Sequence, residues 1–196
     1  ADVGEPDFRF SYFHFQRKFT ALAHHKEAAM LVTPEYVFKD VTRITPAFLA
    51  QMGIRALVLD VDNTLTEDRS QELSPEVAQW LEQMRAADIR MTIVSNGTGK
   101  RVGPFAQKLG MEFISLSAKP LPLGLMRARR RLGVKRSQMA MVGDQLFADR
   151  MAAALYGIPA FVVIARGPDL DASVQLKRRW EKKYWKKFYD QGGQVR

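Results

Sequence analysis

Five short apolar runs, rich in branched side chains, constrain the fold of this chain more than any other feature of its sequence. They lie at 54–59, 89–94, 111–114, 139–142 and 160–164. Each of the first four is followed by residues whose apolar positions repeat with helical spacing, as in 75–84 and 123–132. Continuous apolar strands that alternate with helices are typical of a parallel sheet buried on both faces. The sequence therefore predicts an α/β fold: a doubly wound parallel sheet with right-handed crossovers.

Polar side chains stand at or just after the ends of the first four runs. In chain order they are Asp60, Asp62, Ser95, Asn96, Lys119, Asp144 and Asp149. In open α/β sheets, ligands bind outside the carboxyl ends of the strands. Because these ends share one edge of a parallel sheet, we expect the side chains to lie close together there.

The residue types in this set match the chemistry of phosphoryl transfer. Four carboxylates packed together would raise one another's pKa unless a cation lay among them. Their oxygens suit a hard ion, so we expect Mg²⁺ to be held by Asp60, Asp62, Asp144 and Asp149. Lys119 and Ser95 add a positive charge and a hydroxyl donor for phosphoryl oxygens. A carboxylate can attack such a group and form an acyl phosphate, and Asp62 can exchange protons with the leaving oxygen and the attacking water.

Each of these signals also has a plain structural interpretation. The Asp-x-Asp pair at Asp60 and Asp62 could be a turn or a helix cap. Asp144 and Asp149 could mark a helix start with a favourable dipole contact. The joint occurrence of all the signals, in order and each after a strand, favours the chemical interpretation.

Four segments resemble the ordered motifs of the haloacid dehalogenase superfamily. They are DVDNTL, VSNG, the lysine of SAKP, and GDQLFAD, and the resemblance extends over about residues 31–165. It implies a Rossmann-like core in which Asp60 is the nucleophile and Asp62 the acid and base. It also implies that Asp60, the backbone carbonyl of Asp62 and Asp144 hold magnesium. The second aspartate of the first motif favours a phosphatase over a dehalogenase.

The same resemblance implies roles for the remaining residues of the set. Asp149 would support the metal ligands, Ser95 and Asn96 would bind the substrate, and Lys119 would steady the intermediate. A narrower likeness, which includes EYVFKDVTRI and KRVGPFAQKLG, is to the subfamily IIIA phosphatases related to phosphatidylglycerophosphate phosphatase. It implies that Arg101 contacts the substrate. Ala148 departs from this pattern, because relatives usually carry threonine there.

The spacing of the motifs bears on the substrate. Asp62 and Ser95 are 33 positions apart (95 − 62), and Ser95 and Lys119 are 24 apart (119 − 95). A strand–helix unit takes up about 30 residues by itself, so neither gap holds a sizeable cap domain. We therefore expect an open site that suits a phosphate on a larger body, such as a lipid headgroup, a protein or a nucleic acid.

The chain divides into three parts by its sequence pattern. Residues 1–29 form an extension without periodicity, 30–168 the phosphatase domain, and 169–196 a basic, aromatic tail that is expected to be helical. The extension contains His14, His24 and His25, which lack the further ligands that a zinc site would need. The chain has no cysteine, which excludes a thiol nucleophile.

The tail concentrates the positive charge of a chain whose net charge is +9. If 174–189 is helical, apolar side chains recur every four residues at Leu176, Trp180, Tyr184 and Phe188. The opposite arc carries the basic residues Arg179, Lys182, Lys183, Lys186 and Lys187. Such a helix could lie on an anionic membrane, or its apolar side could pack on the domain while the lysines face water.

Our leading hypothesis is a magnesium-dependent phosphate monoester hydrolase with phosphatidylglycerophosphate as the favoured substrate. We expect it in the cytoplasm, in peripheral contact with an anionic membrane. A second hypothesis is a phosphatase for a nucleic-acid end or a phosphoprotein. A third is a catalytically silent module that binds nucleic acid through its basic surface.

Overall fold

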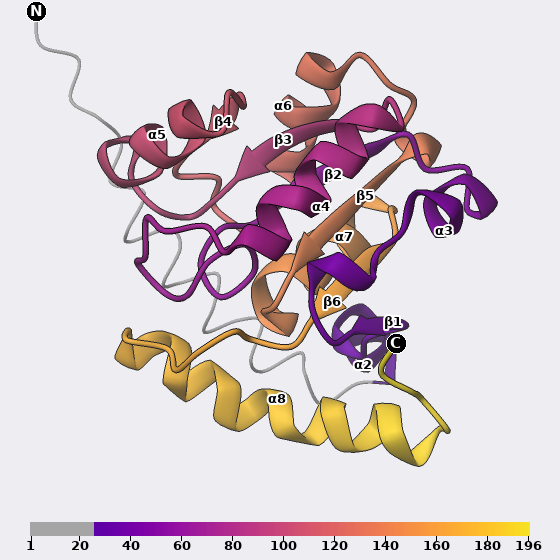
Figure 1. Cartoon of the computed structure of the whole chain (residues 1–196). Coiled ribbons are helices and arrows are strands. Elements are labelled where there is room, and N and C mark those ends of the chain that lie inside the picture. Colours follow the sequence, from indigo (N-terminus) through magenta and orange to yellow (C-terminus); the bar gives the residue numbers. More distant parts are fainter. Residues whose placement is uncertain (1–25) are drawn as a thin grey trace, which may run out of the picture.

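A computed structural model describes residues 26–196 and contains one parallel sheet with the strand order β1-β6-β5-β2-β3-β4 (Figure 1). The strands are β1 (Tyr36–Phe38), β2 (Ala56–Leu59), β3 (Arg90–Val94), β4 (Phe113–Ile114), β5 (Met139–Gly143) and β6 (Ala160–Val163). All five neighbouring pairs are parallel. The predicted α/β class and parallel sheet are therefore confirmed.

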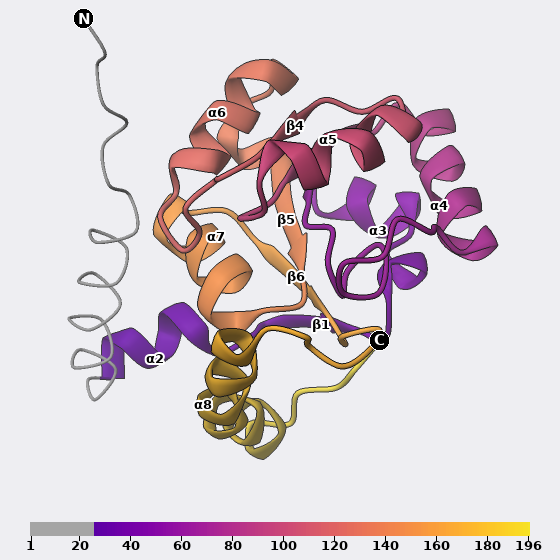
Figure 2. The same ribbon diagram turned by 90° about the vertical axis from the view of Figure 1, so that its left-hand side faces the viewer.

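Helices cover both faces of this sheet, as a doubly wound fold requires. They are α2 (Lys26–Val32), α3 (Pro46–Gln51), α4 (Pro75–Ala86), α5 (Gly99–Lys108), α6 (Leu123–Leu132), α7 (Met151–Tyr156) and α8 (Ala172–Asp190). Leu57 and Leu59 of β2 pack with α3, α4 and α5, whereas Ala56 and Val58 pack with α6 and α7. Figure 2 shows these two helical layers on opposite sides of the strands. The alternation along β2 explains why its sequence is apolar throughout.

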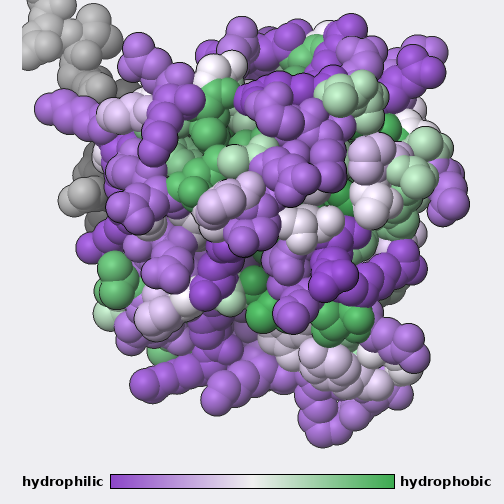
Figure 3. All heavy atoms as spheres, viewed as in Figure 1, coloured by the Kyte–Doolittle hydropathy of each residue, from purple (hydrophilic) through white to green (hydrophobic). Residues whose placement is uncertain are grey.

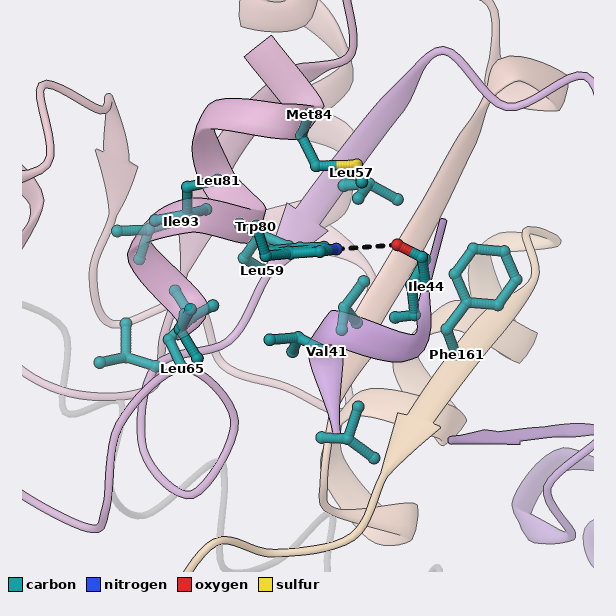
Figure 4. Close-up of a cluster of buried hydrophobic side chains, with 14 of the residues drawn as sticks. Val41, Ile44, Leu57, Leu59, Leu65, Trp80, Leu81, Met84, Ile93 and Phe161 are labelled. Carbon is teal, nitrogen blue, oxygen red and sulfur yellow. Dashed lines mark hydrogen bonds between the residues drawn. The ribbon is translucent and has the colours of Figure 1, made fainter. Parts of the chain in front are cut away.

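The larger core cluster contains a tryptophan whose polar atom is satisfied (Figure 4). The Trp80 indole N–H donates a 2.8 Å hydrogen bond to the backbone carbonyl of Ile44. A buried indole needs such a partner, because an unpaired N–H in the core would destabilise the fold. The bond fixes α4 to the segment that precedes β2.

The sequence pattern did not indicate the edge strand β1. It is only three residues long, too short for a periodic signal, and it pairs with β6 in the register Val37↔Val162. Residues near the end of the described chain extend this edge: Val195 bridges to Val37, and the Arg196 N–H donates to the Val37 carbonyl at 2.9 Å.

The expected absence of a cap domain is confirmed for residues 26–196. Only a loop of residues 60–74 separates β2 from α4, and only α5 and β4 lie between Ser95 and Lys119. The edge formed by the carboxyl ends of the strands is therefore bordered by loops and by the N-terminal part of α8 (Figure 1).

The tail helix α8 packs on the domain through only part of its predicted apolar side. Tyr184 and Phe188 are buried in a cluster with α2, β1, β6 and α7. Leu176 and Trp180, by contrast, are 48% and 45% exposed. The packing alternative therefore holds for the second half of this apolar side, whereas its first half is exposed. The outer side of α8, at the bottom of Figure 3, is mostly hydrophilic.

Within residues 26–196, no helix combines the length and the hydrophobicity that crossing a bilayer requires.

Candidate active site

At the carboxyl-end edge of the sheet, Asp60 directly follows β2. Strand pairing places Leu59 opposite Val142 of β5, and the Asp60 N–H donates to the Val142 carbonyl at 2.9 Å. This register brings Asp60 beside Asp144, which directly follows β5. A cavity of about 320 Å³ opens at this edge. Its walls include the predicted residues Asp60, Asp62, Ser95, Asn96, Arg101 and Lys119.

Lys119 is buried and joins two of the predicted carboxylates. Its ammonium group donates hydrogen bonds of 2.7 Å to Asp60 and 2.7 Å to Asp149, and a third to the Val94 carbonyl at 2.9 Å. Burial lowers the pKa of Lys119, but the charges of Asp149 and Asp60 outweigh it and raise that pKa above its ordinary value. Lys119 therefore stays charged, and a fixed cation of this kind is able to stabilise the charge of a phosphoryl group.

Asp60, Asp144 and Asp149 form a buried cluster whose candidate ligand atoms lie within 4.8 Å of one another. Burial raises the pKa of Asp60 to about 7, and Asp149 adds to the rise while Lys119 opposes it. Burial also raises the pKa of Asp144 well above its ordinary value, against the charge of Arg178. A divalent cation would keep both carboxylates ionised, so this donor set fits a hard metal ion.

Asp62 lies apart from this cluster and forms an ion pair with Arg101. Both oxygens of its carboxylate accept hydrogen bonds of 2.5 Å from the Arg101 guanidinium, and one also accepts from the Arg69 backbone N–H at 3.0 Å. These hydrogen bonds raise the pKa of Arg101. The Asp62 carboxylate is thus outside the metal cluster. Only the backbone carbonyl of Asp62 is then left for the implied contact with the metal. Arg101, expected to contact substrate, binds Asp62 in this structure.

Ser95 and Asn96 lie in the loop after β3. The Ser95 hydroxyl accepts from the Gly97 N–H at 3.0 Å and lines the cavity. The Asn96 side chain donates to the Lys119 carbonyl at 2.9 Å and accepts from the Lys119 N–H at 2.8 Å and from the Ser117 hydroxyl at 2.9 Å. Asn96 also lines the cavity, and its side-chain hydrogen bonds hold the loop that carries Lys119.

Gly143, at the end of β5, makes room for Asp149. A Cβ atom at Gly143 would lie 2.2 Å from Asp149 Cγ, which is an impossible contact. Asp149 lies in the π-helical turn η3 (Leu146–Arg150) and accepts from the Gln145 N–H at 3.1 Å. With Lys119, this bond fixes Asp149 without a hydroxyl at position 148, where Ala148 departs from the pattern of relatives.

Arg178, in the tail helix, is a site residue that the sequence analysis missed. Its guanidinium donates to the Asp144 carboxylate, to the Asp144 carbonyl at 2.7 Å and to Asp169 at 3.0 Å. The residue is hidden in a run of basic side chains that otherwise suggests a solvated surface. Its one signal is Glu181, the only acid in 177–187, three residues further along the helix.

Comparisons with known proteins identify the family of this chain. A family model for haloacid dehalogenase-like hydrolases matches residues 67–157, and one for mitochondrial PGP phosphatases matches residues 19–111. A probable phosphatase of Bacillus subtilis (strain 168), YqeG, is 32% identical over 131 residues, which are 67% of this chain and 76% of that protein. The crystal structure of a 4-nitrophenylphosphatase from Thermotoga maritima has a TM-score of 0.50 at 14% identity, over 60% of this chain and 88% of that one.

Proposed function

We infer the activity from one premise: this chain belongs to the haloacid dehalogenase-like hydrolases, as a phosphatase of the branch that includes the PGP phosphatases. On that premise we propose that it hydrolyses phosphate monoesters through a phosphoryl group carried on Asp60. The observation that supports this most directly is the buried Asp60 carboxylate, 2.7 Å from the Lys119 ammonium, at the wall of an open cavity.

In the first half of the reaction, an Asp60 carboxylate oxygen attacks the phosphorus of the monoester. The bond from phosphorus to the leaving oxygen breaks, and Asp62 gives that oxygen a proton. Lys119 and Ser95 bind the phosphoryl oxygens as their charge develops. Arg101 has to release Asp62 for this step, and the arriving phosphate, which is also an anion, gives its guanidinium another partner.

In the second half, water hydrolyses the acyl phosphate. Asp62, now ionised, takes a proton from the water, whose oxygen attacks phosphorus. The bond between phosphorus and the Asp60 oxygen breaks, which releases inorganic phosphate and restores the Asp60 carboxylate. The pair with Arg101 stabilises the ionised Asp62 that this half-reaction needs.

We propose that the metal is Mg²⁺, which the carboxylates of Asp60 and Asp144 and the backbone carbonyl of Asp62 would hold, with Asp149 in support. Mg²⁺ would neutralise the charge of the phosphoryl group and bring it to the nucleophile. Asp149 also accepts a 2.7 Å hydrogen bond from the Lys119 ammonium, so its removal would disturb the lysine as well.

For the substrate we propose a lipid phosphate such as phosphatidylglycerophosphate. The match to the PGP phosphatase family model and the open, uncapped cavity support this choice. The exposed Leu176 and Trp180 share one arc of α8 with the basic Lys183, close to Ser173 and Lys177 of the cavity wall. We propose that this arc touches an anionic membrane and presents the cavity to a headgroup.

Phosphate release from a panel of substrates tests this proposal. The panel contains phosphatidylglycerophosphate in vesicles, a soluble aryl phosphate, a 5′-phosphorylated oligonucleotide and a phosphopeptide, each with and without Mg²⁺. We expect magnesium-dependent release from the aryl phosphate and the fastest release from the lipid. A preference for the oligonucleotide or phosphopeptide would favour the second hypothesis, to which the exposed basic side chains also point. No release from any member would favour a catalytically silent binding module.

A further inference from the structure

We propose that Arg178 of α8 is a positioning residue for the metal-binding carboxylates. It lies outside the four motifs. It acts by fixing Asp144, which follows β5, relative to the segment that follows β2. This inference rests on the magnesium site proposed above.

The Arg178 guanidinium holds Asp144 by two different groups. It donates to the Asp144 carboxylate oxygen Oδ2 and, at 2.7 Å, to the backbone carbonyl of the same residue. The other carboxylate oxygen accepts from the Thr64 hydroxyl at 3.3 Å. Hydrogen bonds to its backbone carbonyl and to both carboxylate oxygens restrict the rotation of Asp144, and so help to keep its candidate ligand atom within 4.8 Å of those of Asp60 and Asp149.

The same guanidinium joins two further acids. Its Nε donates to Asp169 at 3.0 Å and its Nη1 to Glu181 at 3.1 Å. Asp169 in turn accepts from the Asn63 side-chain amide at 3.0 Å, and Asn63 belongs to the loop that follows the nucleophile. Arg178 thereby connects the segments after β2 and β5, which supply the two carboxylate ligands.

Glu181 anchors this arrangement to the turn that carries Asp149. Its carboxylate is almost fully buried and accepts from the backbone N–H groups of Leu146 at 2.8 Å and Phe147 at 3.2 Å. These N–H groups begin η3, where a buried acceptor satisfies donors that a helical turn leaves unpaired. One turn of α8 therefore fixes both sides of the metal cluster, while Arg179 and Lys182 of the same turn face outward.

Partners of metal ligands usually change metal affinity by about 10–100-fold when they are removed. Without Arg178, Asp144 would keep one weak contact through Thr64 and its carbonyl would lose its partner. We therefore expect Arg178→Met to weaken magnesium binding at least tenfold. Arg179→Met, the same change at the next position of the helix, should leave it unaltered.

The experiment measures the thermal midpoint of the metal-free protein as MgCl₂ is added, which reports binding to the folded state without turnover. We expect the magnesium concentration needed for a fixed rise in the thermal midpoint to increase at least tenfold in Arg178→Met and to stay at the wild-type value in Arg179→Met. Turnover of a soluble aryl phosphate should recover in part at high magnesium. Arg178→Lys should remain defective, because one ammonium group cannot reach Asp144 and Asp169 in the manner of the guanidinium fork.

Three outcomes would overturn the inference. A lower thermal midpoint with an unchanged magnesium requirement would make Arg178 merely structural. A lower magnesium requirement would mean that Arg178 competes with the metal. Full rescue by lysine would mean that charge alone matters. If Arg178→Met fails to fold, Asp169→Ala, which removes the oxygen that accepts from Asn63 but keeps the guanidinium, should still raise the requirement. Failure of wild-type protein to respond to magnesium would instead contradict the proposed metal site.

Discussion

Arg101 and Asp62 form a bidentate ion pair, in which the two terminal guanidinium nitrogens each lie 2.5 Å from a different oxygen of the carboxylate. Arg101 comes from the first turn of α5, and Asp62 from the loop after β2. The pair is partly exposed at the mouth of the cavity, where a phosphate ester would enter. It therefore links the proposed acid and base to the group that would sense the substrate's charge.

We expect Arg101→Met to lower kcat/KM for an aryl phosphate by roughly 10–100-fold, the effect of losing a hydrogen bond to a charged group worth about 1.5–3 kcal/mol. The loss combines weaker phosphate binding with a less well-oriented Asp62. Steady-state kinetics checks this, with the exposed neighbour Lys100→Met as the matched control. An unchanged kcat/KM in Arg101→Met would contradict a role for the pair in turnover.

Asp60→Asn should abolish turnover and keep the fold. The substitution is nearly isosteric, but an amide cannot form the acyl phosphate, so we expect a fall in kcat of at least about 10⁴-fold, since loss of a nucleophile can cost about 10⁶-fold. Circular dichroism and phosphate release check the two halves of this statement. Asp60→Asn protein that turned over near the wild-type rate would retire Asp60 as the nucleophile.

The stability of the metal-free protein should fall as pH rises from about 4 to about 7. Asp60 has its pKa raised to about 7 from an ordinary 3.8, so over this interval the folded state holds a proton that the unfolded state has lost. Ionisation of Asp60 then opposes folding, and the effect is complete above pH 7. Urea unfolding at several pH values checks this slope, with Asp60→Asn as the control that lacks the group.

Magnesium should reverse this loss, because a bound cation replaces the proton. We therefore expect MgCl₂ to stabilise the protein strongly at pH 8 and weakly at pH 5. Equal stabilisation at both values would argue against metal binding at the buried carboxylates.

Sequence reasoning found the sheet and the motif residues because both leave a local signal. The run 54–59 is apolar at every position but Arg55 and is followed by Asp60, and the apolar run 139–142 is followed, after one glycine, by Asp144. Because the two strands are parallel neighbours, the two aspartates meet at the same edge of the sheet. The strand β1 escaped because three residues carry no period. Arg178 escaped because its role depends on where α8 docks, and a basic run looks the same whether one member points inward or none does.

The same limit explains the tail. A four-residue repeat of apolar side chains does not indicate how much of the helix packs on the domain. Tyr184 and Phe188 meet α2, β1, β6 and α7, whereas the helix passes the open cavity at Ser173 and Lys177 and leaves Leu176 and Trp180 exposed. Only the tertiary arrangement separates these halves.

Gly143→Ala should damage catalysis more than stability. The new methyl group would lie 2.2 Å from the Cγ atom of Asp149. It would therefore displace Asp149 and so disturb Lys119. We expect a loss of about 1–3 kcal/mol in unfolding free energy and a fall in kcat well beyond that of the control Gly99→Ala. At Gly99 the nearest neighbour, Ser115 Oγ, is at an ordinary 3.4 Å. Similar kinetics for the two alanine variants would show that the fit of Asp149 against Gly143 does not matter.

The two tryptophans of α8 should respond differently if the exposed arc touches a membrane. Trp180 is 45% exposed, whereas Trp185 lies partly buried with its ring 6.2 Å from that of Phe188. We expect Trp180→Ala to weaken binding to anionic vesicles and slow hydrolysis of vesicle-embedded lipid phosphate, with the thermal midpoint and aryl phosphate turnover unchanged. Trp185→Ala should lower the thermal midpoint and affect both activities together.

The basic side chains of α8 give the same test a measurable charge dependence. Gln substitutions at Arg179, Lys182 and Lys183 remove three charges, each worth about 1 kcal/mol near an anionic bilayer. We therefore expect vesicle affinity to fall by roughly 100-fold, with a smaller effect at high salt, where surface charges are screened. Aryl phosphate turnover should be unaffected, because these side chains face away from the cavity wall. Unchanged vesicle binding in this triple variant, or equal loss of both activities, would rule out the membrane role of α8 and leave the phosphatase chemistry of Asp60 untouched.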